Sequence, residues 1–557
     1  MTHATETVLR RPRSAAAALP IAELIALSVV ALGFLLLSAP LLSQPFGRDQ
    51  GIFATIADAI LRGQLPYRDA WDHKPPGIDY AYALAFRLFG RSWQAVHLLE
   101  QLVLLGGMVG LWALLRPAGA QAAVAAAALF GAAAILQFEW WDRGQAEMFI
   151  AGLSAVGLAA LVAGRRWRAV SALVGGAVLG ALIWFKPTAA PLTLLGGIIL
   201  LARSPRSWGT ARDLGAYAGG VLALVLVPSG LLLAGGAFAE MWDAVVVFNQ
   251  LHVQTGANLT LAATAWATVD FFGRMGPLTP LAAAGVIGAR RSPALTALLV
   301  GWLLAALAGV WSQGKFFSYH WSVALPPLAG LAGSGLIAVW ENIRRPGPEV
   351  RLRRGAAAIL ALALLLPVVH EQQAKLGRDL PYLLGKVSDR DYFARFGHNL
   401  HDRDVYSFSA ARETAAYLAA RTTPNDTVLV WGFQALVNWL ADRRAPTRYI
   451  FSYPLTIERP ESPLRRQARD IFLREFDAAP PAYVVLVAKD VNPIQTQESI
   501  ALIETFPAFK ERLARDYVKE REIAEFQIYR RKGPEAVGRS REPGARGGSG
   551  AGNLKKG

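Results

Sequence analysis

The sequence predicts a mainly α-helical, polytopic membrane protein that ends in a small α/β domain. The chain has 557 residues, of which 53% are hydrophobic, and its mean hydropathy of +0.31 is high for a soluble protein. Apolar blocks long enough to cross a bilayer recur from Ile21 to about His370. From about residue 371 to 532 the chain is polar, with short β-rich runs between helical stretches.

The first apolar block, 21–42, follows a basic segment that contains Arg10, Arg11 and Arg13, and could be taken for a signal peptide. It is too long for an ordinary signal peptide, and further spans follow it. We therefore interpret it as a retained first helix after a cytoplasmic N-terminus, residues 1–20. The apolar pattern predicts about eleven spans, near 21–42, 93–115, 118–137, 147–163, 169–185, 187–202, 214–234, 276–288, 294–311, 321–340 and 355–370.

The formal net charge is +16, and the excess lies in short loops between apolar blocks and in the tail. Nucleic-acid binding is therefore the weaker interpretation of this charge. Alternate connections, such as those with Arg116 and Arg344, are rich in arginine, and the positive-inside rule places them in the cytoplasm. The loop 43–92 and the domain 371–532 are then expected outside. Cysteine is absent, which excludes disulfides and thiolate chemistry.

The C-terminal part shows alternating strand and helix patterns. Predicted strands are Thr427–Trp431, Thr447–Phe451, Tyr483–Val487 and Phe526–Tyr529, and predicted helical stretches include 464–477 and 497–519. Residues 533–557 are rich in glycine, arginine and serine and nearly free of apolar residues, which predicts a disordered tail.

The segment Gly47–Ile78 concentrates polar chemistry directly after the first span. Asp49 falls within about ten residues of the point where that span leaves the bilayer. Isoleucines at helical spacing predict an amphipathic helix over 50–62 that lies on the membrane, and a glycine and a proline end it. A loop then leads through His73 to Lys74 and two prolines. An acid and a lysine are thus expected beside the bilayer surface, a position suited to chemistry on a lipid-linked substrate.

Further polar residues stand at the outer ends of later spans, where each costs free energy to hold near hydrocarbon. They are Asp142, Arg143, Gln145 and Glu147 just before the fourth span, Lys186 between the fifth and sixth spans, and Lys315, Tyr319 and His320 before the tenth. One cavity that holds these acids and lysines would suit transfer of a group from a phosphate leaving group.

Several candidates also have a purely structural interpretation, whereas Lys186, with apolar sequence on both sides, is harder to explain as a solvated residue. Asp49 can act as the N-cap of a helix that starts at Gln50, and Lys74 can be an interfacial lysine that reaches towards water. Glu147 can simply mark the end of a span. Tyr319 and His320 can pack or bond locally. Capping and catalysis by Asp49 are compatible.

Four stretches together resemble the integral-membrane (C-type) glycosyltransferases of the protein O-mannosyltransferase and lipid A aminoarabinose transferase kind. They are GRDQG, with Asp49 as the acid of the first outer loop, YRDAWDHKPPG, WFKPTAAPL and KFFSYHWSVALPPLAG. The segment TVLVWGFQALVNWLADRRAPTRYIF also resembles the outer C-terminal domain that is common in bacterial members. The resemblance covers most of residues 20–530. One departure stands out, because many relatives have Asp-Glu where this chain has Asp49-Gln50.

The resemblance implies a sugar donor on a polyprenyl monophosphate and an acceptor that is a protein, lipid or glycan of the cell envelope. It implies Asp49 as the general base of an inverting transfer, and Lys74 and Lys186 as ligands of the donor phosphate. Glu147 matches the second acidic position of relatives and would orient acceptor or sugar hydroxyls. Further candidates for orienting substrate are Asp142, His73, Tyr319 and His320.

The same resemblance implies a bacterial inner membrane protein whose active site and C-terminal domain are extracytoplasmic. The two lysines could replace the metal that nucleotide-diphosphate donors usually require, so we assign no metal ligand and leave a divalent metal open. Asp389-Arg390-Asp391 and Asp402-Arg403-Asp404 resemble metal-binding Asp-x-Asp patterns, but we interpret them as solvated linker. His398 and His401 make a weak metal site.

Two other function classes compete with the enzyme. A transporter or flippase of lipid-linked sugars would be expected to show internal repeats and ionisable residues at the bilayer midplane. No repeat is evident here, and the charges cluster at outer span ends, which favours the enzyme. A membrane-anchored assembly factor would leave Asp49 and Lys74 without a joint role.

Overall fold

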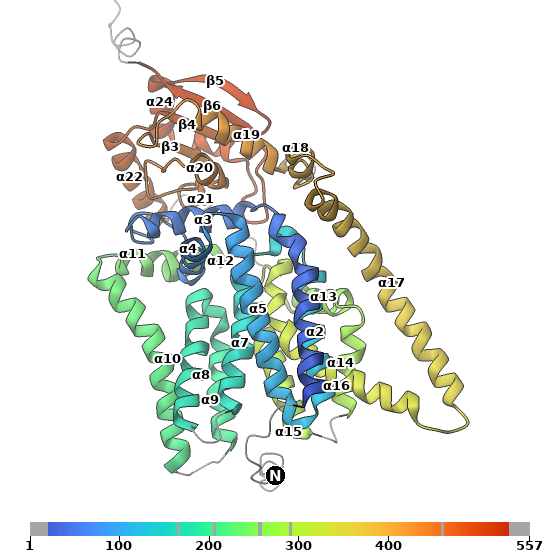
Figure 1. The fold of residues 1–557 in the computed structure, drawn as a ribbon. Helices are drawn as coiled ribbons and strands as arrows, with labels where there is room; N and C mark the ends of the chain where they lie inside the picture. The colour runs from blue at the N-terminus through green and yellow to red at the C-terminus, as the bar shows by residue number, and fades with distance from the viewer. Residues whose placement is uncertain are drawn as a thin grey trace, which may run out of the picture.

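The computed structural model describes residues 20–163, 168–203, 208–253, 259–288, 292–400, 402–457 and 462–533. Figure 1 shows a bundle of long helices with an α/β domain above one end, which we call the domain end of the bundle. Residues 1–19 of the predicted N-terminal segment and residues 534–557 of the predicted tail lie outside the described residues.

The bundle consists of apolar helices, and each predicted span coincides with one of them. Those long enough to cross a membrane are α2 (Ile21–Ser38) with η1 (Ala39–Ser43), α5 (Trp93–Leu115) with η2 (Arg116–Ala118), α8 (Arg168–Phe185), α10 (Trp208–Ala234), α15 (Pro293–Trp311), η7 (Ser318–Ala324) with α16 (Leu325–Arg344), and α17 (Val350–Leu383). Shorter apolar helices are α6 (Ala120–Leu136), α7 (Ala146–Ala163), α9 (Ala190–Arg203) and α14 (Leu278–Ile287). The protein is therefore a multi-pass membrane protein, as predicted.

Glycines allow close backbone contacts between neighbouring helices of the bundle. A Cβ atom added to Gly220 of α10 would lie 2.1 Å from the carbonyl oxygen of Leu173 in α8. One added to Gly335 of α16 would lie 1.8 Å from the carbonyl oxygen of Leu281 in α14. Small residues at such crossings bring backbones together where no hydrophobic effect drives association.

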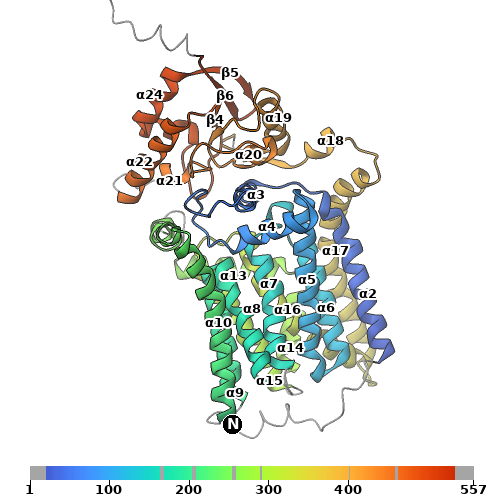
Figure 2. The same ribbon diagram turned by 60° about the vertical axis from the view of Figure 1, so that its left-hand side comes forward.

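Two short helices, α3 (Arg48–Leu61) and α4 (Gly77–Phe89), lie across the domain end, between the bundle and the C-terminal domain (Figures 1 and 2). The predicted helix over 50–62 is therefore present, but the expectation that it lies on the membrane was wrong. Ile52 and Ile56 are only 2% and 1% exposed, and they belong to the same apolar cluster as Trp431 of the C-terminal domain. The domain folds back over α3 and covers the apolar stripe that we assigned to lipid.

Contact between α3 and the domain depends on Gly51. A Cβ atom at this position would lie 2.6 Å from the Cβ atom and 2.9 Å from the backbone nitrogen of Leu436. We expect Gly51→Ala to destabilise the protein by about 1–3 kcal/mol, because backbone must move to admit the methyl group. Gly33→Ala, in α2, is the matched control, since nothing lies within 4 Å of its added Cβ. Equal melting temperatures for the two purified variants would contradict this.

The C-terminal domain is built on a four-stranded sheet in the order β3 (Val428–Trp431), β4 (Tyr483–Val487), β6 (Phe526–Arg531), β5 (Tyr517–Ile523). The β3–β4 pair is parallel, and the other two pairs are antiparallel. Both β3 and β4 are buried at every residue, which explains their uninterrupted apolar sequences. The helices of the domain include α19 (Phe408–Ala419), α20 (Leu436–Ala441), α21 (Tyr453–Thr456), α22 (Pro463–Ala478) and α24 (Pro507–Asp516).

Two of the strand and helix predictions in this domain were wrong. Thr447–Phe451 has a bent, irregular backbone rather than a strand, and its aromatic residues pack into the core instead of pairing in the sheet. The predicted helical stretch 497–519 is divided into α23 (Ser499–Leu502), η8 (Ile503–Thr505) and α24, and its last residues start β5. A further hairpin, β1 (Gly397–Leu400) with β2 (Asp404–Ser407), was not predicted. Helix α17 continues through residue 371 and connects to this hairpin through α18 (Asp389–Phe393).

Candidate active site

Asp49 lies in the first turn of α3, at the junction of the bundle and the C-terminal domain. The helix begins at Arg48 with Gly47 as its N-cap, so Asp49 is not the cap that one interpretation of the sequence proposed. Its side chain remains 31% exposed and is free to face a substrate.

Gln50 performs the capping role and anchors this turn. Its Oε1 accepts a hydrogen bond from the Gly47 amide at 3.2 Å, while its Nε2 donates to the carbonyl oxygens of Trp141 at 2.7 Å and Arg143 at 2.8 Å. A glutamate here would have no donor for these two carbonyls. The departure from Asp-Glu therefore makes position 50 a structural residue that fixes Asp49 relative to the segment before α7.

Lys74 approaches Asp49 from the loop between α3 and α4. Its Nζ lies 3.5 Å from Asp49 Oδ2 and 4.5 Å from the centre of the Phe53 ring. The Tyr67 hydroxyl donates to the Lys74 carbonyl oxygen at 2.8 Å and holds the loop in place. Although burial lowers the pKa of Lys74, the carboxylates of Asp49 and Asp72 hold it above its ordinary value, so the lysine is charged.

Lys186 and Glu147 form a second ion pair at the same end of the bundle. Lys186 stands between α8 and the short helix η4 (Pro187–Ala189), and its Nζ donates to the carboxylate of Glu147 in the first turn of α7. The side chain of Glu147 is only 3% exposed, and Nε2 of His320 lies 3.8 Å from its Oε1.

Tyr319 joins the two ion pairs into one site. The Lys186 Nζ lies 5.8 Å from the centre of the Tyr319 ring, and the phenol lies within hydrogen-bonding reach of Asp49. The structure thus brings Asp49, Lys74 and Lys186 together with Tyr319 and Glu147, although these residues come from separate parts of the chain.

Asp142 and His73 lie at the edge of this site. Asp142 accepts hydrogen bonds from the Ser318 hydroxyl and from the backbone amide of Glu139, so both of its carboxylate oxygens serve local structure. The Nδ1 of His73 lies 3.0 Å from Asp72 Oδ1, and burial lowers the pKa of this histidine.

Two residues that adjoin the site, His252 and Tyr453, were not identified from the sequence, and they connect to Lys315, which was expected in the same cavity. The Nζ of Lys315 contacts Nε2 of His252 in α12 (Asn249–Val253), and the Nδ1 of His252 lies 2.9 Å from the hydroxyl of Tyr453 in the C-terminal domain. The rings of His73 and His252 are 4.5 Å apart. No spacing in the sequence connects these positions, because they meet only after the domain folds back.

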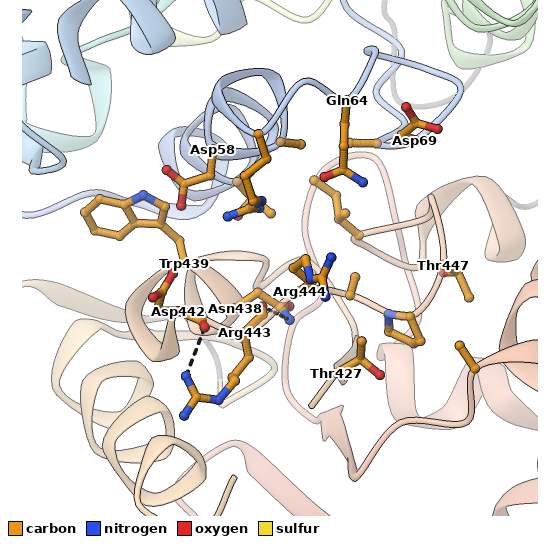
Figure 3. Close-up of a pocket in the computed structure, with 18 residues that line it drawn as sticks. Asp58, Gln64, Asp69, Thr427, Asn438, Trp439, Asp442, Arg443, Arg444 and Thr447 are labelled. Carbon is orange, nitrogen blue, oxygen red and sulfur yellow. Dashed lines mark hydrogen bonds between the residues drawn. The ribbon is translucent and has the colours of Figure 1, made fainter. Parts of the chain in front are cut away.

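A separate hollow of about 260 Å³ lies between the second half of α3 and the C-terminal domain (Figure 3). None of Asp49, Lys74 and Lys186 lines it. Several of its charged groups are already paired, as Asp58 with Arg91 at 2.7 Å and Asp69 with Arg68 at 2.7 Å. It therefore lies outside the candidate active site.

The described residues show no cluster suited to a metal ion. In the described part of the chain, no group of three or more His, Asp or Glu side chains is arranged to hold a metal ion. Asp404 was expected in solvated linker, but it begins β2 and pairs with Arg48 at 2.9 Å and with His398 at 2.9 Å. Asp389 lies on exposed α18 and pairs with Arg412, and His401 lies outside the described residues.

Comparison with known proteins supports a membrane glycosyltransferase. Residues 73–231 match the family model of dolichyl-phosphate-mannose-protein mannosyltransferases. The fold is similar to that of ArnT from Cupriavidus metallidurans, in crystal structures bound to undecaprenyl phosphate (TM-score 0.55) and in the apo state (TM-score 0.52). In both comparisons the identity is 16%, and the match covers 91% of this chain and 97% of the other. A comparison with curated protein sequences gives no match. The resemblance inferred from the motifs is confirmed.

Proposed function

We propose that this protein transfers a sugar from a polyprenyl-phosphate donor to a hydroxyl group of a cell-envelope acceptor. The observation that carries the proposal is the meeting of Asp49, Lys74 and Lys186 in one site at the domain end of the bundle. A carboxylate beside two ammonium groups suits removal of a proton next to a phosphate leaving group. That ArnT, a protein of similar fold, binds undecaprenyl phosphate supports a lipid-linked donor.

The reaction follows from these roles. The Asp49 carboxylate accepts the proton of the acceptor hydroxyl as its oxygen attacks the anomeric carbon. The bond from that carbon to the phosphate oxygen breaks, and its electron pair stays on the phosphate, which gains one negative charge. Lys74 and Lys186 stabilise this charge as it develops. Attack from the side opposite the phosphate inverts the anomeric carbon.

Glu147 is the candidate for orienting the hydroxyl groups of the sugar or acceptor. It lies within the site, bonded to Lys186, and its second neighbour is His320. Tyr319 lies between the ion pairs and can contact the same groups. A phosphate monoester is a good leaving group, so the two lysines are sufficient to stabilise its developing charge in this proposal.

The site lies on the outer face of the bacterial inner membrane in this proposal. Figure 1 shows α5, α10 and α16 running from the domain end to the opposite end of the bundle, where the arginine-rich connections after α5 and α16 and the first turns of α10 lie. The positive-inside rule assigns that end to the cytoplasm. The donor lipid then remains in the outer leaflet while its head group reaches Asp49.

Two linked measurements test the function. Mass spectrometry of envelope lipids and glycans from cells with and without the gene is expected to show one species that loses a single sugar. The purified full-length protein in lipid nanodiscs is then expected to add that sugar to the deficient species from its polyprenyl-phosphate form. If the protein in proteoliposomes moved the donor across the bilayer but transferred no sugar to an acceptor, a transporter would be the better interpretation.

A further inference from the structure

One lysine of the candidate active site, Lys315, differs from the other two in having no carboxylate partner in the described part of the chain. Asp49 accompanies Lys74, and Glu147 accompanies Lys186. Lys315, by contrast, has no acidic partner within 4.0 Å among the described residues, and its hydrogen-bond partner is the imidazole of His252. Burial of an ammonium group without a counter-charge is costly unless another group compensates it. The uncompensated ammonium group of Lys315 therefore points to an anionic ligand.

Lys315 lies close to the first loop, because its Nζ contacts His252, whose ring lies 4.5 Å from the ring of His73, the residue before Lys74. The charges of Lys186 and Lys74 both act on it, and it in turn acts on His73 and His320. The groups that surround it come from the first loop, the α8–η4 junction, α12 and η7. They are His73, Lys74, Lys186, His252 and His320.

We infer that Lys315 is a third ligand of the donor phosphate, positioned by His252 and by Tyr453 of the C-terminal domain. The inference rests on the proposed function and extends it to a residue to which no role has been assigned. Lys74 and Lys186 each already have a carboxylate neighbour, so a third ammonium group adds positive charge that can stabilise the two negative charges of the phosphate after the sugar leaves it.

The contact chain assigns a task to the C-terminal domain. Tyr453 is 1% exposed, and its hydroxyl lies 2.9 Å from Nδ1 of His252, whose Nε2 contacts Lys315. Burial and the neighbouring His73 and Lys315 lower the pKa of His252, so its ring is neutral and its Nε2 can accept a hydrogen bond from the ammonium group. Tyr453 thus fixes the ring that holds Lys315, and it is a positioning residue.

The site also gives Lys315 a pH dependence. Burial, with the charges of Lys186 and Lys74, lowers its pKa to about 7. Below this value the lysine is charged and binds phosphate, and as the pH rises above it the free protein loses that charge. A phosphate monoester has its second pKa near about 6, so it stays a dianion over this range. Affinity should therefore fall by up to about tenfold per pH unit between pH 7 and 9.

The test measures binding of undecaprenyl phosphate to the full-length protein in nanodiscs. Lys315→Met is expected to weaken binding at pH 7 by about tenfold to a hundredfold, the usual range for a hydrogen bond to a charged group. Lys315→Arg is expected to retain binding and to remove the pH dependence, because arginine stays charged. Lys510→Met, which removes an exposed lysine paired with Glu504, is the matched control.

A double-mutant cycle tests the contact chain. Tyr453→Phe removes only the hydroxyl and should weaken binding a few fold in the wild-type background and not at all beside Lys315→Met. Equal effects of Tyr453→Phe in both backgrounds would show that it acts elsewhere and would overturn its positioning role.

The outcomes separate this inference from the proposed function. If Lys74→Met weakens binding of undecaprenyl phosphate and Lys315→Met does not, the assignment of Lys315 as a phosphate ligand is wrong, whereas the proposed donor site is still supported. If the wild-type protein itself fails to bind undecaprenyl phosphate, the proposed donor class falls, and the inference falls with it.

Discussion

Asp49→Asn is expected to lower kcat for sugar transfer by about two to four orders of magnitude, the range that general base catalysis contributes. The amide keeps the size of the carboxylate but cannot accept the proton of the acceptor hydroxyl. The first turn of α3 should persist, because Gly47 and Gln50, and not Asp49, cap the helix. Binding of undecaprenyl phosphate should persist as well, since Lys74 and Lys186 remain. Single-turnover assays with saturating donor measure this step directly.

The matched control for this experiment is Asp389→Asn. Asp389 lies on exposed α18 in one of the Asp-x-Asp patterns and pairs with Arg412 on the surface. This variant should transfer sugar at the wild-type rate. If Asp49→Asn also turned over at that rate, Asp49 would leave the mechanism, and Glu147 would become the remaining acid of the site.

The sequence was sufficient for the membrane bundle because hydrocarbon imposes long apolar helices that leave an unmistakable pattern. It was also sufficient to propose Asp49, Lys74 and Lys186, since charged residues at span ends are costly without a purpose. The position of α3 was not predictable in the same way. Its isoleucine stripe fits a membrane surface and a protein surface equally, and only the fold of the C-terminal domain selects the latter.

Long-range contacts explain why sequence analysis did not identify some residues of the site. Tyr453 and His252 lie about two hundred residues apart in the chain, and neither stands at a span end. Gln50 was interpreted as the loss of an acid, but its three hydrogen bonds show that an amide is what the fold requires there. The roles of these residues depend on contacts between segments that are distant in the chain, and such contacts cannot be predicted from a single sequence.

Arg143 shows that the same signal can mark a structural residue. It belongs to the polar group before the fourth span, but it is 1% exposed, and its guanidinium donates to the carbonyl oxygens of Ala134 and Ile135 near the end of α6. Its charge also compensates buried Glu100, which accepts from the Gly144 amide at 2.9 Å. Arginine here closes a helix end and balances an acid.

Arg143→Met is therefore expected to lower the free energy of unfolding by about 3–5 kcal/mol, the usual cost of breaking a buried charge network from one side. Arg143→Lys should recover only part of this, because an ammonium group cannot donate to two carbonyls in the planar geometry of a guanidinium group. Thermal unfolding in detergent, followed by tryptophan fluorescence, measures both against Arg212→Met, whose side chain is 65% exposed. If Arg143→Met kept the wild-type melting temperature but lost sugar transfer, Arg143 would instead take part in the reaction.

Asp49→Asn and Arg143→Met are thus expected to differ in their defects. Asp49→Asn should lose turnover with the fold intact, whereas Arg143→Met should lose stability of the fold itself. That contrast separates the residues that the bundle holds for a substrate from those that hold the bundle.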